Sequence, residues 1–548
     1  MASHTASQKY LSTRGGSYDL SFEEVVLKGL ASDGGLFIPE DIPSLPADWH
    51  DKWKDLSFQE LAFEIFSLYI SPSEIPPQDL RGIIQRSYST FRTPQVTPIV
   101  TLDSKRNIHL LELFHGPTFA FKDVALQFLG NLFEYFLVRR NEGKTGKERE
   151  QLTVIGATSG DTGSAAIYGL RGKKDVSVFI TFPYGKVSPI QEAQMTTVTD
   201  ANVHCLAVQG TFDDCQDIVK SLFADASLNA NHRLAAVNSI NWARILAQIT
   251  YYFSSYFSLL RQLSNQSPSD SNPQIAFTVP TGNFGDILAG YFAKRMGLPV
   301  AKLLIATNSN DILHRFWQSG RYEKHAVPAP QAEGGIKEDG VQAHEEGVKE
   351  TLSPAMDILV SSNFERLLWF LAHEIHGAQS SDVKEKRRIA GEKVRSWLND
   401  LKSKDGFAVD DALLKAAKRD FASERVNDEQ TIETIREVFC TTGTTGANGN
   451  YILDPHSAVG IAASVRQPTS AEQHYISLST AHPAKFSHAV ERALKGQDGF
   501  SFEQVLPREF DGMLDAEKRV RKIERRQGSE GVKKVIIEEV EKELRNAH

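Results

Sequence analysis

Short apolar runs that end in turns recur through the middle of the chain and indicate its architecture. They are LTVIGA at 152–157, VSVFIT at 176–181, IAFTVP at 275–280, KLLIAT at 302–307 and HYISLST at 474–480. Each run leads through a turn toward a segment with helical patterning. Strands that alternate with helices are typical of parallel βαβ units with right-handed crossovers. We therefore predict an α/β fold built on open parallel sheets.

The chain before residue 99 has a different, mixed pattern. Ser21 and Glu24 form a capping box ahead of an apolar run, which predicts a helix start. A second helix is predicted over 56–70, and proline-rich joints and a Gly-Gly turn separate these elements. We therefore expect residues 1–98 to form a small α+β N-terminal domain.

Two polar stretches and a charged end punctuate the rest of the chain. SNQSPSDSNPQ at 264–274 is typical of a linker or surface loop, and residues 322–350 are interpreted as a mobile insertion. After about Phe510 the chain becomes charge-dense, so residues 511–548 are predicted to be a charged C-terminal tail that ends in a helix over 535–544. A charge run of this kind is usually exposed to solvent.

Composition and charge narrow the class of protein. The 548 residues are 41% hydrophobic and 24% charged, which excludes a largely disordered, collagen-like or membrane-spanning chain. The apolar stretch 245–260 is shorter than a bilayer span and is predicted to be a buried helix. With 61 Lys+Arg against 69 Asp+Glu, the net charge of −8 argues against nucleic acid as a partner.

Cysteine usage and the N-terminus indicate the compartment. Cys205, Cys215 and Cys440 match neither a zinc site nor a disulfide framework, so we expect no metal and a reducing environment. The first residues lack the apolar segment of a secretory signal, so we expect a cytoplasmic protein. No heptad pattern is present, and both a monomer and a homodimer remain open.

A lysine at the start of an apolar helix is the first candidate for chemistry. In FHGPTFAFKDVALQFLGNLFEYFLVRR at 114–140, Thr118 is expected to cap a helix that is apolar nearly all round, with Lys122 in its first turn. Burial and the helix N-terminus both disfavour the charged amine, so its pKa should be low, as a Schiff-base nucleophile requires. The alternative is a structural lysine that pairs with Asp123 or extends to the surface.

Three turns after predicted strands are candidates for binding anions. VIGATSGDTGSAAIYGL at 154–170 and FTVPTGNFGDILAG at 277–290 each place a Gly-rich turn between a strand and a helix, where backbone N–H groups attract anions. SLSTAHPAKF at 477–486 supplies Thr480, His482 and Lys485 beyond a strand, where open α/β sheets bind ligands. Two such Gly-rich loops favour a phosphate-bearing ligand beside an anionic substrate, although an ordinary tight βα turn is the alternative for the first.

These segments carry a resemblance to a known family. HGPTFAFKD at 115–123 resembles the cofactor-lysine motif of pyridoxal-phosphate enzymes of fold type II, the tryptophan synthase β group. Together with SFEEVVLKGLASDGGLFIP, TSGDTG, NSINWARILAQ, GNFGD and STAHPAKF, it resembles more narrowly threonine synthase, in the longer form of fungi and many bacteria. The match extends over most of the chain. It implies a catalytic domain at 99–510 with two open parallel-sheet α/β lobes, the smaller at about 125–240, and the cofactor between them.

The resemblance also implies how the cofactor is held. Lys122 would bind pyridoxal 5'-phosphate covalently and act as the catalytic residue that moves protons. The GNFGD loop would hold the cofactor phosphate with backbone donors, Asp286 would cap the following helix, and Thr480 would meet the pyridine nitrogen. The implied cofactor-binding residues are Lys122, Gly282, Asn283, Phe284, Gly285, Asp286 and Thr480.

The implied reaction is the last step of threonine biosynthesis. O-phospho-L-homoserine and water give L-threonine and phosphate by γ-elimination and β-addition of water. The substrate carboxylate is assigned to Ser159, Asp161 and Thr162, although Asp161 is unhelpful by charge and is alternatively a residue that orients the loop. The leaving phosphate is assigned first to Lys485 and Arg244, and then to Asn241, Ser239 and His115.

Alternatives remain for these residues and for the function. Arg244 is alternatively a helix-surface arginine, and His115 alternatively makes a capping or core hydrogen bond. A serine or threonine dehydratase-like lyase of the same fold is the nearest alternative function, and it lacks a second phosphate site. A catalytically silent, ligand-binding homologue is disfavoured because Lys122, Thr480 and the GNFGD loop are all present. The expected partner is a small-molecule substrate.

Overall fold

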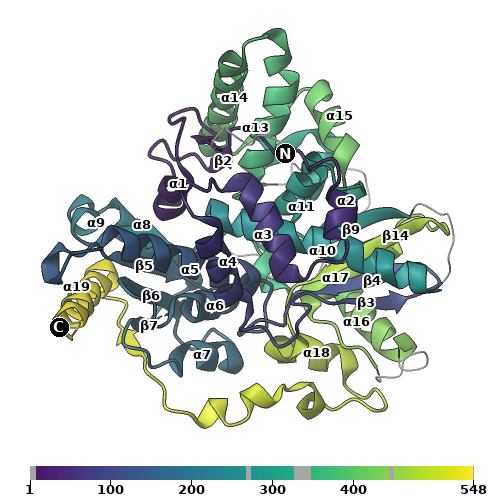
Figure 1. Ribbon diagram of the computed structural model, residues 1–548. Helices are drawn as coiled ribbons and strands as arrows, with labels where there is room; N and C mark the ends of the chain where they lie inside the picture. The colour runs from purple at the N-terminus through teal and green to yellow at the C-terminus, as the bar shows by residue number, and fades with distance from the viewer. Residues whose placement is uncertain (1–7, 267–272, 326–346, 443–449, 547–548) are drawn as a thin grey trace.

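Two parallel sheets, placed side by side and covered by helices, organise the structure (Figure 1). The computed structural model describes residues 8–266, 273–325, 347–442 and 450–546. Each of the predicted apolar runs forms a strand, which confirms the α/β fold. These strands are β5 (Leu152–Ala157), β6 (Val176–Pro183), β9 (Gln274–Pro280), β10 (Val300–Thr307) and β14 (Gln473–Ser479).

The larger sheet has six strands in the order β13-β10-β9-β14-β4-β3. All neighbours are parallel except β3 and β4. The remaining strands are β3 (Ile99–Asp103), β4 (Ile108–Glu112) and β13 (Phe421–Arg425). The helices of this lobe are α10 (Trp242–Gln266), α11 (Gly285–Met296), α12 (Ile312–Ser319), α16 (Asp428–Thr442), α17 (Pro455–Val465) and α18 (Ser487–Leu494). The predicted buried helix at 245–260 is therefore confirmed as part of α10.

The smaller sheet has five parallel strands in the order β15-β7-β6-β5-β8. The remaining strands are β7 (Val203–Val208), β8 (Leu234–Ala236) and β15 (Arg521–Ile523). Its helices are α5 (Lys122–Arg140), α6 (Asp161–Leu170), α7 (Pro189–Thr196), α8 (Phe212–Ala224), α9 (Ala226–His232) and α19 (Gly528–Asn546). Helices α5 and α6 pack against each other.

The N-terminal unit begins as its capping pattern predicts. Ser21 accepts a hydrogen bond from the N–H of Glu24, and the Glu24 side chain accepts one from the N–H of Ser21. Helices α3 and α4 then pack on α10 and α5 of the catalytic lobes. The elements are β1 (Tyr10–Ser12), β2 (Phe37–Pro39), α1 (Phe22–Lys28), α2 (Trp49–Trp53), α3 (Phe58–Tyr69) and α4 (Pro77–Tyr88).

The charged end of the chain is part of the small lobe, which corrects the expected exposed tail. Strand β15 pairs with β7, and α19 packs on α8 (Figure 1). Val532, Ile536 and Val540 lie four residues apart on one face of α19 and are buried against the sheet. The charged residues between them occupy the other faces, so this charge-rich segment forms an amphipathic helix.

A helical projection and a small two-stranded antiparallel sheet were not predicted. Helices α13 (Phe364–Ile375), α14 (Val383–Lys404) and α15 (Asp411–Asp420) project from the top of Figure 1. Strand β11 (Arg321–Glu323) pairs with β12 (Gly406–Ala408), and Tyr322 is only 1% exposed. Residue 322 therefore belongs to the folded structure and not to the expected insertion. Most of that expected insertion, 326–346, and most of the expected linker, 267–272, lie outside the described residues.

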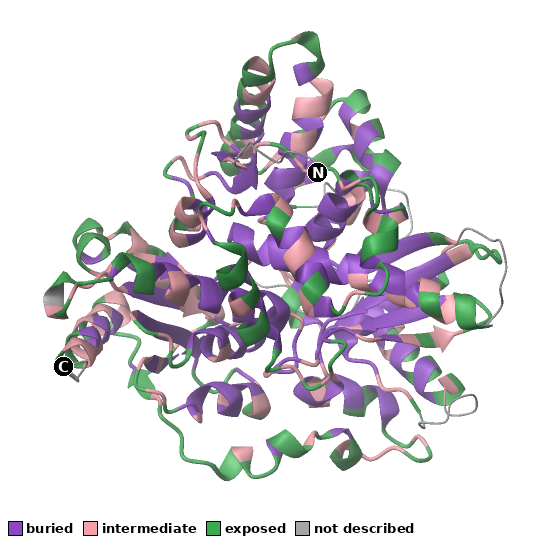
Figure 2. Ribbon diagram, in the orientation of Figure 1, coloured by how far each residue is buried: buried purple, intermediate pink, exposed green. Residues whose placement is uncertain are grey.

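One large apolar core joins these units, and Figure 2 shows buried residues in each of them. It includes Tyr10 of the N-terminal unit, Phe128 of α5 and Trp242 of α10, all fully buried. The rings of Tyr10 and Trp242 lie 6.0 Å apart. This shared core holds both sheets so that the carboxyl ends of their strands can contribute to one site.

Candidate active site

Lys122 begins α5 after a sharply folded turn. Thr118 does not cap the helix as expected: its N–H and hydroxyl instead donate to Asp123 at 2.7 and 2.8 Å. Phe119 has a φ of 59°, in the left-handed region that a bulky residue seldom adopts. The Asp123 carboxylate therefore binds Thr118 and stabilises the turn that presents Lys122.

The Lys122 side chain is buried and lies beside Asp161. Its Nζ is 3.7 Å from Asp161 Oδ2, and its side chain is 10% exposed. Burial lowers the pKa of Lys122, Lys485 and Arg244 lower it further, and Asp161 opposes them. The surface alternative and the pairing with Asp123 are therefore both inconsistent with the structure. The amine has the environment of a nucleophile.

Asp161 also binds Lys485, which comes from the other lobe. Asp161 Oδ1 is 2.7 Å from Lys485 Nζ, and Lys485 donates to the carbonyl of Thr118 at 2.8 Å. Burial opposes ionisation of Asp161, but Lys485 and Lys122 outweigh it and hold the pKa far below its ordinary value. The carboxylate is therefore charged and turned toward the lysines.

The GNFGD loop lies between β9 and α11, as predicted. Phe284 precedes the helix with a φ of 62°, and the structure shows no side-chain cap on the first N–H groups of α11. A Cβ on Gly282 would lie 2.9 Å from the carbonyl oxygen of Ala355, so this position requires glycine. Uncapped N–H groups at a helix N-terminus form an anion site.

Asp286 does not cap α11, which corrects its expected role. Its carboxylate accepts hydrogen bonds from the hydroxyls of Tyr251 and Tyr252 on α10. Burial raises its pKa to about 7, although the two tyrosine hydrogen bonds lower it. Asp286 thus anchors α11 to α10 beside the loop.

Thr480 follows β14 and lies next to the lysine turn. Its carbonyl accepts from the N–H of Phe121 at 2.8 Å, and its own N–H donates to the hydroxyl of Ser457 at 3.2 Å. Asp454 in turn accepts a hydrogen bond from Ser457. The Thr480 backbone is therefore held at both its N–H and its carbonyl.

Arg244 and Asn241, which are close in sequence, have different environments. Arg244 is 4% exposed, and its Nε and Nη1 have no hydrogen-bond partner in the described part of the chain. Burial lowers its pKa to about 10. Asn241 instead donates to the Val26 carbonyl at 2.9 Å and accepts from the N–H of Ala243 at 3.1 Å, which gives its amide a structural role in joining the N-terminal unit to α10. Arg244 is not a helix-surface arginine.

The remaining predicted residues lie around these groups. Ser159 is exposed and Thr162 half-buried at the start of α6. His115 Nε2 lies 2.8 Å from Glu112 Oε2, which matches its structural alternative. Ser239 Oγ lies 3.4 Å from Ser362 Oγ, near the GNFGD loop.

The sequence analysis missed two sets of polar residues that support the site. Ser361 Oγ donates to the Gly282 carbonyl at 2.7 Å, and Asn363 Nδ2 donates to the Asn283 carbonyl at 2.9 Å. Gln191 of α7 donates to Asp161 at 3.0 Å. The run Ser361-Ser362-Asn363 before an apolar helix was a visible capping signal, whereas nothing local distinguishes Gln191.

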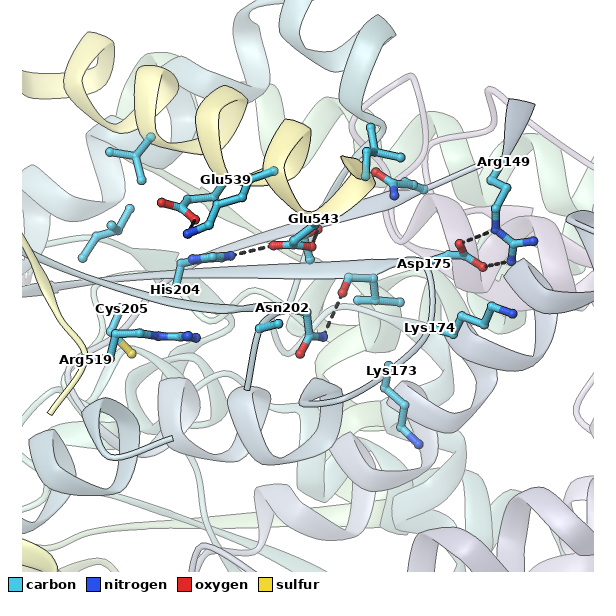
Figure 3. A pocket seen from close by; sticks show the side chains of 18 of the residues that line it. Arg149, Lys173, Lys174, Asp175, Asn202, His204, Cys205, Arg519, Glu539 and Glu543 are labelled. Carbon is cyan, nitrogen blue, oxygen red and sulfur yellow. Dashed lines mark hydrogen bonds and ion pairs between the residues drawn. The ribbon is translucent and has the colours of Figure 1, made fainter. Parts of the chain in front are cut away.

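A cavity of about 710 Å³ lies elsewhere, beneath α19 at the amino ends of β6 and β7 (Figure 3). None of the predicted site residues lines it. Two pairs of its lining residues bind each other: Arg149 Nε donates to Asp175 at 2.9 Å, and Glu543 lies 2.6 Å from His204 Nε2. Open parallel sheets bind ligands at the carboxyl ends of their strands, so we place the candidate site there.

The residues present fit a covalently bound, phosphorylated cofactor. Lys122 is a buried amine with a lowered pKa. Among the described residues, no side chain caps the N-terminus of α11, and two buried donors of Arg244 have no partner. Together these groups can hold an aldehyde carbon and an anion. These groups lie at the carboxyl ends of strands from both sheets.

Comparisons with known proteins agree with this site. Residues 91–357 match the family described as pyridoxal-phosphate dependent enzyme. Residues 9–88 match threonine synthase N terminus, and residues 457–536 match threonine synthase, C-terminal. The fold and the lysine site define a pyridoxal-phosphate-dependent enzyme of fold type II.

Full-length relatives are more specific. Threonine synthase from Schizosaccharomyces pombe is 56% identical over 513 residues, 93% of this chain and 94% of that protein. The crystal structure of threonine synthase from yeast has a TM-score of 0.87 at 53% identity, covering 98% of this chain and 99% of that one. Pyridoxal-phosphate-bound threonine synthase from Brucella melitensis has a TM-score of 0.81 at 38% identity, covering 97% and 99%. The chain belongs to the threonine synthase family, and it is a pyridoxal-phosphate-dependent lyase.

Across the residues that the structure describes, no helix combines the length and apolarity that a membrane span requires. The longest, α10, has 25 residues and lies within the protein core.

Proposed function

We propose that this protein converts O-phospho-L-homoserine and water to L-threonine and phosphate in the cytoplasm, as the last step of threonine biosynthesis. The observation that carries the proposal is a buried amine, Lys122, with two buried cations near it, Lys485 and Arg244. A dehydratase acting on serine or threonine needs the amine but no cation for a leaving phosphate. The two cations therefore favour a phosphorylated substrate.

Lys122 is the proposed catalytic residue. Pyridoxal phosphate, when bound, withdraws electrons from the substrate α carbon. Because burial and the neighbouring cations disfavour its charged form, Lys122 can bind the cofactor carbon, and once released it can accept and return protons at the α and β carbons.

Two anion sites are proposed for the phosphates. The N-terminus of α11, with Gly282, Asn283, Phe284 and Gly285, would hold the cofactor phosphate. Lys485 and Arg244 would hold the phosphate that leaves the γ carbon, since both are buried cations with N–H donors left for a ligand. We drop Asn241 from this set because its amide already binds Val26 and Ala243.

The substrate carboxylate is proposed to bind at the turn before α6. Thr158 Oγ1 accepts from the N–H groups of Gly160 and Gly163 at 2.9 and 2.8 Å, which fixes the loop. The exposed hydroxyl of Ser159 and the half-buried Thr162 then stand at the helix N-terminus, where a carboxylate is stabilised. Asp161 points to the lysines and is not a ligand in this scheme.

A strap from the C-terminal region covers the lysine turn. The ring of Phe510 packs on that of Phe119 at 5.0 Å, and Glu509 pairs with Arg92 at 2.6 Å. Phe119 and Phe510 belong to one buried cluster with Ala484, the neighbour of Lys485. The strap therefore excludes water from this side of the Lys122 turn, and Thr480 is proposed to face the pyridine nitrogen from β14.

Turnover assays test the proposed function. The protein loaded with pyridoxal phosphate should release phosphate and form threonine in equal amounts from O-phospho-L-homoserine, with much slower turnover of serine and threonine. Turnover of serine or threonine alone would instead support the dehydratase function.

The role of Lys122 is tested by colour. The loaded protein should absorb visible light, and borohydride should fix the cofactor on Lys122. Lys122→Ala should lose both the covalent attachment and turnover, while Lys173→Ala, which removes a lysine paired with Glu134 outside the site, should keep both. Retained attachment in Lys122→Ala contradicts the assignment.

A further inference from the structure

Lys485 and Asp161 form a buried ion pair between the two lobes. Lys485 lies in the turn Pro483–Phe486 after β14, and Asp161 begins α6. Their side chains are 0% and 8% exposed, with 2.7 Å between Nζ and Oδ1. A buried pair of this kind is favourable only if further hydrogen bonds satisfy both partners. Both partners have such bonds here.

The carboxylate of Asp161 is held from three directions. Gln191 Nε2 donates to the oxygen that Lys485 binds, at 3.0 Å, while the other oxygen lies 3.7 Å from Lys122 Nζ. Gly160 leaves room for Gln191: its φ is 140°, and a Cβ there would lie 2.4 Å from the glutamine side chain. This loop is therefore shaped around the contact between Gln191 and Asp161.

Lys485 has one N–H group left for a ligand. Its ammonium has three donors, and two of them bind Asp161 and the carbonyl of Thr118. Thr118 belongs to the turn that presents Lys122, so these two bonds fix the ammonium beside the catalytic amine. The third donor is available to a substrate oxygen.

We propose that Asp161 is a positioning residue that keeps Lys485 charged and aimed at the substrate phosphate, with Gln191 orienting its carboxylate. This inference rests on the proposed function, in which Lys485 receives the leaving phosphate. It replaces the assignment of Asp161 to the substrate carboxylate, which like charge disfavours.

The charge balance around Lys485 supports this role. The groups that face it from α5 and α6 are Lys122, Asp123 and Asp161, and His482 lies in its own segment. Lys122 repels the ammonium, and burial raises the pKa of Asp123 to about 6 while Thr118 binds its carboxylate. In the part of the chain that the structure describes, Asp161 is the carboxylate in direct contact with the Lys485 ammonium. Burial lowers the pKa of an ammonium that has no such partner, by up to about 3–5 units when the group is fully buried.

The test measures inorganic phosphate binding to the holoenzyme by calorimetry, at pH 6.5, 7.5 and 8.5. Taking the ratio of variant to wild-type dissociation constants at each pH cancels the ionisation of phosphate itself. For Asp161→Asn, the ratio should rise with pH, to about tenfold or more at pH 8.5, because Lys485 loses its charge. Asp161→Glu, which keeps the charge, should restore a ratio that does not vary with pH.

Two results for Asp161→Asn overturn the proposal. One is a ratio that does not vary with pH. The other is tighter phosphate binding by the variant at every pH, which would mean that Asp161 only repels the phosphate. In the double variant Asp161→Asn with Lys485→Arg, the guanidinium stays charged without a partner, so the pH dependence should disappear. If Asp161→Asn does not fold, Gln191→Ala replaces it: this variant keeps the carboxylate and loses the group that orients it, so phosphate binding should weaken by a smaller factor, and unchanged binding contradicts the role of Gln191.

A matched control and a separate assay isolate the result. Asp175→Asn removes a carboxylate that binds Arg149 far from the site, and its ratio should stay near one. Turnover of O-phospho-L-homoserine by the wild type tests the proposed function independently. A wild type that binds phosphate but does not turn this substrate over refutes the function and leaves the role of Asp161 in anion binding intact.

Discussion

Asp286→Asn tests whether a buried carboxyl beside the GNFGD loop is held near its neutral form. Asp286 is 8% exposed, accepts hydrogen bonds from Tyr251 and Tyr252, and has one carboxyl oxygen, Oδ2, without a partner among the described residues. Burial raises its pKa from 3.8 to about 7, despite both tyrosines. Asparagine has the same shape and keeps an oxygen for the tyrosines.

The magnitude follows from linkage between protonation and folding. Because the folded-state pKa lies above the unfolded value, the folded protein binds this proton more tightly, and that stabilisation is lost as the pH rises from 3.8 through about 7. At 1.36 kcal/mol per pKa unit the total is about 4 kcal/mol, of which about 2 kcal/mol falls between pH 5.5 and 8.5. The free energy of unfolding of Asp286→Asn should therefore rise by about 2 kcal/mol relative to that of the wild type between pH 5.5 and 8.5.

Urea unfolding of both proteins at pH 5.5, 7.0 and 8.5 measures this gain. A difference in free energy of unfolding that is the same at all three pH values refutes the reasoning. Tyr252→Phe serves as a control, because it removes a hydrogen bond that lowers the pKa and keeps the titrating carboxyl. Its stability should depend on pH at least as steeply as that of the wild type.

Three further substitutions probe the loop, the lobe junction and the C-terminal helix. Gly160→Ala should lower kcat and cost about 1–3 kcal/mol of stability, since a Cβ at φ 140° meets Gln191; unchanged kinetics would contradict this. Arg366→Met should cost about 3 kcal/mol by urea unfolding, because the fully buried guanidinium donates to the carbonyls of Phe37 and Ile240. Ile536→Ala should lower stability by about 2–5 kcal/mol, whereas a detached tail would show no change.

Local patterns were reliable where neighbours in sequence decide the structure. The run at 152–157 forms β5 with the same bounds, and the capping box at Ser21 and Glu24 begins α1. The apolar surround of Lys122 correctly indicated a buried amine. In each case the signal lies within one element, because strand burial and helix capping depend on residues a few positions apart.

Predictions from local patterns were wrong where residues distant in the sequence determine the local structure. Asp286 is a plausible cap of α11, but two tyrosines from α10 bind it 34 and 35 residues away. The segment at 521–523 is short and charged, and pairing with β7 makes it a strand.

The sequence by itself therefore determined the class of fold and the family, and it indicated the lysine and loops that are proposed to carry the chemistry. Only the tertiary structure decided which charges neutralise one another. Lys485 reaches Thr118 across 367 residues and shares Asp161 with Lys122, while Arg244 is buried with two donors that no described residue pairs. The physical reason is that periodicity and motifs record which positions are buried, whereas the free energy of a buried charge depends on the partners that the fold brings to it.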